Sequence, residues 1–111
     1  MDIETLREYC LTFADVEETF PFDDVSLVFK VKGKMFLLLP LDAPEWVSMK
    51  CDPERAIDLR ERYAGVAPAW HFNKKHWNQV ALSSDVPDSL IKELVRHSYE
   101  LVRAKLPKQM R

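Results

Sequence analysis

The stretch VSLVFKVKGKMFLLL, residues 25–39, decides the fold of this 111-residue chain. Within residues 25–31 every odd-numbered side chain is apolar, whereas Ser26 and Lys30 lie on the other side of an extended chain. Lys32-Gly33 then favours a tight hairpin turn, and the apolar run Met35–Leu39 is typical of a central strand covered on both faces. The pattern predicts a β-hairpin around which the rest of a sheet forms.

Three helices are predicted, one before this hairpin and two after it. Asp2 is a suitable N-cap for a first helix of about three turns, in which apolar residues recur at helical spacing. Asp52 and Pro53 predict the start of a second helix, which Gly65 is expected to close in the left-handed conformation. Pro87 opens a third helix with a wide apolar stripe.

Residues 46–50 and 76–82 are predicted as two further strands, and residues 66–70 as irregular chain. The resulting order is α-β-β-β-α-β-α. It predicts an α+β domain in which helices pack on a mostly antiparallel sheet. One shared core is expected to contain Phe29, Leu37, Cys51, Ile57 and Leu94.

Length and composition predict one soluble domain over residues 1–111. Hydrophobic residues make up 47% of the chain and charged residues 31%, and the longest strongly apolar run is far too short to cross a membrane. The N-terminal stretch MDIETLREYC lacks the basic segment and apolar block of a secretory signal. Two cysteines are too few for a disulfide framework. A reduced cytoplasmic location is therefore expected.

Charge is distributed unevenly along the chain. The formal net charge is −2, which argues against a protein that coats nucleic acid through bulk electrostatics. Residues 1–24 nevertheless carry a net charge of −7 and residues 25–111 a net charge of +5. The folded domain can therefore present one positive face, provided that the first helix lies on the other side.

The segment HFNKKHWNQV, residues 71–80, interleaves basic and aromatic side chains and has two interpretations. In the first, the lysine pair contacts phosphates while neighbouring groups reach sugar or base. In the second, Phe72 and Trp77 pack inward and hold the loop while the lysines stay in water, because burying an unpaired ammonium is costly. Strand alternation also places Lys30 and Lys50 on the sides of their strands opposite the apolar residues, where they can extend a positive face. The candidate nucleic-acid contacts are His71, Asn73, Lys74, Lys75, His76, Trp77, Lys30 and Lys50.

The remaining candidates predict no enzyme, no metal centre and no cofactor. His71 and His76 have a spacing that suits neither one helix face nor a tight metal loop. Cys51 precedes the second helix, where the macrodipole can lower a thiol pKa, but a small buried residue is the simpler interpretation. The acid pairs Glu17-Glu18 and Asp23-Asp24 have no polar cluster beside them. The chain has only two glycines, which cannot form a phosphate cradle.

Five segments, in order, carry a family resemblance: EETFPFDD, FKVKGKMFLLL, KCDPERAIDLRERY, HFNKKHWNQV and SYELVRAKLP. Together they resemble the MmcQ/YjbR family of small bacterial proteins over nearly the whole chain, and H-x-N-K-K-H-W is the most specific piece. The resemblance implies a compact α/β "double wing" fold similar to type III secretion chaperones, with DNA as partner. Taken with the first interpretation of residues 71–80, it predicts that the 71–77 loop contacts phosphates. Where the family commonly has Gly and Tyr, this chain has Ala69 and Trp70. Ala69 disfavours a left-handed backbone there, whereas Trp70 keeps the aromatic ring.

A protein- or peptide-binding module without nucleic-acid activity is the alternative. It is favoured by the chaperone-like fold and by the acidic total charge. A positive surface around residues 71–77 would favour DNA as the partner, whereas an exposed apolar groove or a paired sheet edge would favour a protein. No membrane partner is predicted.

Overall fold

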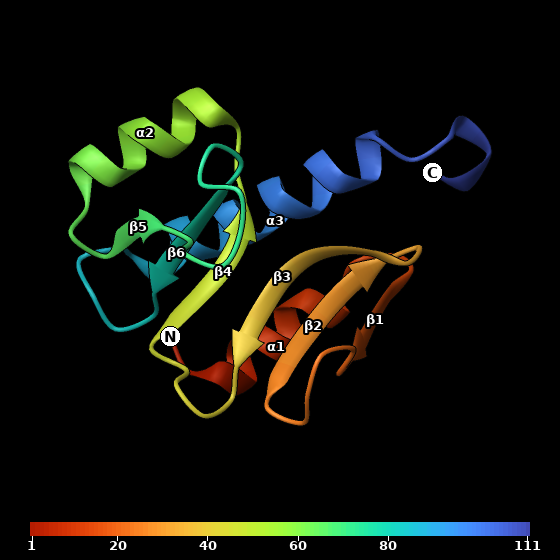
Figure 1. Ribbon diagram of the computed structural model, residues 1–111, viewed down its shortest axis with the longest axis horizontal. Helices are drawn as coiled ribbons and strands as arrows, with labels where there is room; N and C mark the ends of the chain where they lie inside the picture. The colour runs from red at the N-terminus through yellow and green to blue at the C-terminus, as the bar shows by residue number, and fades with distance from the viewer.

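A computed structural model describes all residues from 1 to 111, and its centre is a six-stranded antiparallel sheet ordered β1-β2-β3-β4-β6-β5 (Figure 1). The helices are α1 (Ile3–Leu11), α2 (Pro53–Arg62) and α3 (Asp88–Ala104), followed by a short 3-10 helix, η1 (Lys108–Met110). The strands are β1 (Val16–Thr19), β2 (Ser26–Val31), β3 (Lys34–Pro40), β4 (Trp46–Lys50), β5 (Val66–Pro68) and β6 (Trp77–Ala81). The predicted α+β class is confirmed. None of the helices combines the length and the apolar character needed to span a membrane.

The β2–β3 hairpin forms as the sequence predicts. Lys32 and Gly33 both have positive φ, 50° and 81°, the geometry of a two-residue turn whose twist matches that of the strands. Phe36 is an extra residue between the pairs Phe29–Leu37 and Lys30–Met35, which makes a β-bulge in β3. A bulge bends its strand, and Figure 1 shows β3 as a curved strand.

All three helices contribute to one core, which lies on one face of the sheet. In Figure 1, α1 and α3 lie behind the sheet, and no helix crosses its front. The register places Val28, Leu38, Ser48 and Gln79 side by side on that front face. The sheet is therefore covered by helices on one side only. The buried core residues include Leu6, Cys10, Phe29, Leu37, Met49, Ala56, Leu59, Val80, Ile91, Leu94 and Val95.

The sequence pattern does not predict the edge strands β1 and β5. β1 carries Glu17, Glu18 and Thr19, and β5 ends on Pro68, so neither alternates. They are strands because β2 and β6 supply backbone partners. Both are short, as edge strands that resist pairing with another chain commonly are.

One of the five predicted core residues is misplaced. Phe29, Leu37, Cys51 and Leu94 are buried, whereas the side chain of Ile57 is 55% exposed. On α2 only a narrow stripe faces the sheet, and its buried residues are Ala56 and Leu59. Ile57, one position after Ala56, is therefore rotated into solvent.

The role expected for Gly65 is also wrong. α2 ends at Arg62, Tyr63 follows in an extended conformation, and Gly65 is not among the residues with positive φ. A Cβ on Gly65 would lie 2.1 Å from the Ser84 hydroxyl oxygen. Glycine is needed here because another chain segment approaches closely, not because the backbone is left-handed.

Candidate nucleic-acid interface

The loop between β5 and β6, residues 69–76, is held by two stacked rings. The ring centroids of Phe72 and Trp77 are 4.6 Å apart and their planes differ by 20°. Trp77 is only 8% exposed, so its indole is not available to stack on a base. The prediction that these two rings hold the loop is confirmed.

Backbone hydrogen bonds fix the shape of the loop tip. The Asn73 side-chain oxygen accepts from the Lys75 amide at 2.9 Å, and the Asn73 carbonyl accepts from the amides of His76 and Trp77. Asn73 is thus occupied in closing a turn of the kind that Asn commonly stabilises. The His76 carbonyl in turn accepts from the Cys51 amide at 2.8 Å, which ties the loop to the end of β4.

Arg60 of α2 holds the loop from the other side. Its guanidinium donates to the Lys74 carbonyl and to the Asn78 side-chain oxygen, the latter at 2.7 Å. Asn78 is buried and its amide donates to the Ala56 carbonyl at 3.3 Å. Because guanidinium hydrogen bonds are directional, this chain of contacts sets the position of the loop relative to α2.

The lysine pair points into solvent, as predicted. Lys74, Lys75 and His71 are exposed, and the Lys74 ammonium lies 4.4 Å from the centroid of the Trp70 ring. Trp70 itself is 64% exposed, which is unusual for so large an apolar ring. An exposed indole beside the Lys74 ammonium, with Lys75 next in the chain, can stack on a base while the lysines contact phosphates.

Trp70 is absent from the predicted contacts. The available signal is its position: the aromatic ring follows a proline-containing irregular stretch and has no apolar partner at strand or helix spacing. Because no apolar residue lies at strand or helix spacing from Trp70, the sequence places its ring on no apolar face, and exposure is the expected result.

Lys30 and Lys50 lie at different distances from this loop in the sheet. Lys50 is the register partner of Trp77, so its backbone lies beside the loop, but its side chain lines a pocket with Lys105, which directly follows α3. Lys30 lies on β2 opposite Glu17 of β1, with β3 between it and β4. The structure therefore brings together the residues of the 70–77 segment and leaves Lys30 apart.

Cys51 occupies a buried structural position. It is 3% exposed, and burial raises the pKa of its thiol to about 11, so little thiolate exists near neutral pH. His97 accepts a hydrogen bond from the Asp52 amide at 3.1 Å, and burial lowers its pKa. No group of three or more His, Cys, Asp or Glu side chains is placed to hold a metal ion.

One acid of each pair has structural contacts. Glu18 forms an ion pair with Arg7 of α1, and this guanidinium lowers the pKa of the carboxyl. Asp23 accepts from the amides of Val25 and Ser26, which lowers its pKa. Both acids are thus bonded to nearby parts of the fold and lie outside any cluster of polar side chains suited to catalysis.

Residues 11–101 match the family model of YjbR. The chain belongs to the YjbR family. It is 34% identical over 112 residues to the uncharacterized protein YjbR of Escherichia coli strain K12, covering all of this chain and 95% of that protein. It is 32% identical to the uncharacterized protein YbdF of Escherichia coli O157:H7, over 89% of this chain and 82% of that one.

Solved structures show the same YjbR-family fold. A Deinococcus radiodurans protein with a DUF419 domain superposes with a TM-score of 0.92 at 43% identity, over 98% of this chain and 84% of that chain. A Pseudomonas syringae protein superposes with a TM-score of 0.80 at 25% identity, over 93% of this chain and all of the other. Family and fold are therefore established together.

Proposed function

We propose that this YjbR-family protein binds nucleic acid through the tip loop, which we define as residues 70–75. The observation that carries the proposal is an exposed ring, Trp70, in contact with Lys74 on a loop that also exposes Lys75 and is fixed by the Phe72–Trp77 stack. A fixed loop loses little conformational freedom on binding, so more of the contact energy is available for affinity.

The tip loop suits single-stranded DNA or RNA better than a duplex. A base in a duplex is already stacked, whereas an unpaired base can be laid on an indole, a contact worth about 1–3 kcal/mol. Lys74 and Lys75 then supply phosphate contacts, which position the strand but carry no sequence information. The proposal assigns no catalytic residue, and two buried free cysteines, Cys10 and Cys51, fit action in a reducing cytoplasm.

The test is a salt-titrated anisotropy measurement with labelled oligothymidine, a matched duplex and a matched RNA. The wild-type protein should bind the single strands at low salt. Lys74→Glu with Lys75→Glu should weaken this binding and reduce the slope of log K against log salt by about 0.7 for each phosphate that is no longer neutralised. The charge-matched control, Lys92→Glu with Lys108→Glu, changes two exposed lysines away from the loop and should bind like the wild type.

Two outcomes would contradict the proposal. One is an absence of binding to all three nucleic acids at low salt. The other is equally weakened binding in the loop variant and its control, because this would indicate general electrostatics and not the tip loop.

A protein partner is the second candidate, and an apolar surface favours it. Phe20, Phe22, Val25 and Leu41 are 47%, 64%, 39% and 38% exposed. The Leu41 amide donates to the Val25 carbonyl, so the β1–β2 and β3–β4 loops meet at one end of the sheet. Exposed apolar patches commonly mark interaction sites. For this candidate, Phe20→Ser with Phe22→Ser should abolish binding to a peptide library, whereas the tip-loop variant should retain it.

A further inference from the structure

The sheet opens between β3 and β4. These strands pair only at Leu37–Met49 and Leu38–Ser48, and the bulged residue Phe36 directly precedes the first of these pairs. Ser98 of α3 bridges the opening: the Lys50 amide donates to its hydroxyl at 2.9 Å, and this hydroxyl donates to the Phe36 carbonyl at 2.6 Å. The opening is therefore a fixed feature of the fold, with α3 as its floor.

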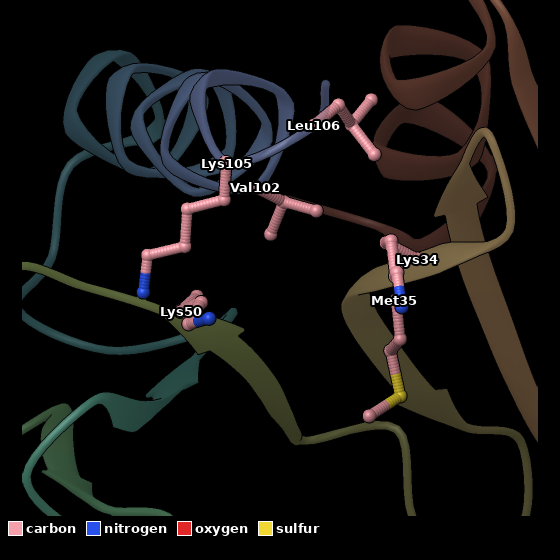
Figure 2. A pocket seen from close by; sticks show the side chains of 6 residues that line it. All are labelled: Lys34, Met35, Lys50, Val102, Lys105 and Leu106. Carbon is pink, nitrogen blue, oxygen red and sulfur yellow. The ribbon is translucent and has the colours of Figure 1, made fainter. Parts of the chain in front are cut away.

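A pocket of about 350 Å³ lies at this opening, within the size range of small-molecule sites. Figure 2 shows Lys50 and Lys105 converging from one side, with Lys34 and Met35 on the opposite wall. The lining residues are Lys34 and Met35 of β3, Lys50 of β4, Val102 of α3, and Lys105 and Leu106 directly after α3. Lysine side chains thus lie on both walls of the pocket, and the other lining residues, Met35, Val102 and Leu106, are apolar.

The three lysines, which we call the lysine triad, have no acidic partner. No carboxylate lines the pocket, and none of the triad takes part in an ion pair, whereas Lys32 and Arg55 pair with Asp15 and Glu93 elsewhere. Helix α3 offers a partial explanation for Lys105 alone, since a cation at a helix C-terminus is stabilised by the macrodipole. Lys34 and Lys50 lie on strands and have no such partner.

The arrangement carries a cost in the free protein. Burial and the neighbouring Lys105 both lower the pKa of Lys50, which means that its positive charge is disfavoured where it stands. An apolar side chain at this position would not be repelled by Lys105. Charges held in an unfavourable position within a cleft are typical of binding sites.

We propose that the lysine triad binds a small organic phosphate whose apolar part contacts Met35, Val102 and Leu106. A phosphate dianion offers three acceptor oxygens to three ammonium groups, and such charge-assisted hydrogen bonds are about twice as strong as neutral ones. The site is separate from the tip loop, because neither Lys74 nor Lys75 lines the pocket.

The test is an amide NMR titration of the intact protein with phenyl phosphate, inorganic phosphate and phenol. Phenyl phosphate should shift the amides of the lysine triad and bind about tenfold more tightly than inorganic phosphate, since one buried apolar group contributes about that factor. Phenol should bind more weakly still. Lys50→Met and Lys34→Met should each weaken phenyl phosphate binding about tenfold, while the control Lys92→Met should leave its affinity unchanged.

Oligothymidine separates this site from the proposed nucleic-acid interface. A saturating oligonucleotide should shift tip-loop amides and leave phenyl phosphate bound, and Lys74→Glu with Lys75→Glu should not alter phenyl phosphate affinity. The inference is overturned if phenyl phosphate shifts only tip-loop amides, or if Lys50→Met and Lys92→Met bind it equally. It is also overturned if the oligonucleotide alone shifts the triad, which would assign these lysines to nucleic-acid backbone.

Discussion

Trp70 and Trp77 show how one residue type takes opposite roles within a single short segment. Trp77 is 8% exposed and stacks on Phe72, whereas Trp70 is 64% exposed and contacts Lys74. The difference comes from register. Trp77 begins β6, whose position is set by β4, but Trp70 precedes the turn and no strand orients it.

This contrast predicts different costs of truncation. Trp77→Ala should lower the free energy of unfolding by roughly 3–5 kcal/mol, because it removes a buried ring and leaves a cavity. Trp70→Ala should change it by less than about 0.5 kcal/mol while weakening single-strand binding. Urea denaturation measures both. Equal destabilisation by the two variants would show that Trp70 is part of the packed loop.

The lowered pKa of Lys50 predicts that the stability of the protein depends on pH. Its pKa in the folded protein lies below the ordinary value of 10.5, so on raising pH the folded protein loses this proton before the unfolded chain does. Stability therefore rises as pH increases through the folded pKa toward 10.5. Lys50→Met should be more stable at neutral pH, by less than about 1 kcal/mol for a half-exposed group, and should lack this alkaline rise.

Thermal unfolding of both proteins between neutral and alkaline pH measures this effect. Lys92→Met is the control, since Lys92 is exposed and lies over the Tyr9 ring on another side of α3. A Lys50→Met protein that is less stable than wild type at neutral pH would contradict the assignment of repulsion between Lys50 and Lys105.

At the scale of elements, one hydroxyl joins β3, β4 and α3. Ser98 is fully buried and satisfies the Lys50 amide and the Phe36 carbonyl where the strands part. Ser98→Ala should destabilise the protein by roughly 1–3 kcal/mol, because two buried backbone groups are then left without a partner. Denaturant unfolding and amide exchange at Lys50 measure the change. Ser83→Ala, at an exposed serine, is the matched control. A similar loss of stability in both variants would show that the Ser98 hydrogen bonds do not stabilise the junction of β3, β4 and α3.

The end of α2 gives a second prediction at this scale. Gly65→Ala should destabilise the protein by about 1–3 kcal/mol through steric overlap with Ser84, and Ser84→Gly should restore part of that stability.

Gly33 is the comparison, because a Cβ there meets no atom within 4 Å but the backbone has positive φ. Gly33→Ala should therefore cost about 1–2 kcal/mol, and changes at neighbouring residues should not restore this stability. Denaturant unfolding of the single and double variants measures these costs. Rescue of Gly65→Ala by Ser84→Gly distinguishes close approach from backbone strain.

At the scale of the whole molecule, the acids of β1 and the tip loop lie at opposite edges of the sheet. The acidic edge is partly neutralised, because Glu18 pairs with Arg7 and Asp15 with Lys32. In Figure 1, α1 lies behind β2 and β3, away from β5. This is the arrangement that the uneven sequence charge requires for a local positive surface on a protein with a net charge of −2.

The small positive surface predicts a shallow salt dependence. Two or three phosphate contacts on single-stranded DNA correspond to a slope of log K against log salt of about −1.4 to −2.1. A much steeper slope would mean that lysines beyond the tip loop also contact phosphates. A slope near zero would mean that base stacking is the only contact. Anisotropy titration over a range of salt concentrations measures the value directly.

Local sequence determined the elements whose signals lie within a few residues. Asp2 and Asp52 accept the amide hydrogen bonds expected of N-caps, Lys32-Gly33 forms the hairpin turn, and alternation places Phe29 in the core. These features depend on backbone sterics and nearby hydrogen bonds, which a short stretch contains in full. The same holds for the inward rings and outward lysines of residues 72–77.

Only the tertiary structure decided the features that depend on distant neighbours. Glu17 and Glu18 lie in a strand because β2 offers a ladder, and Ile57 is exposed because α2 presents a narrow stripe to the sheet. The lysine triad joins β3, β4 and α3, whose approach depends on a bulge and on Ser98. Alternation assigned the faces of residues within each element, but the distances between elements follow from packing, which no single segment of the sequence contains.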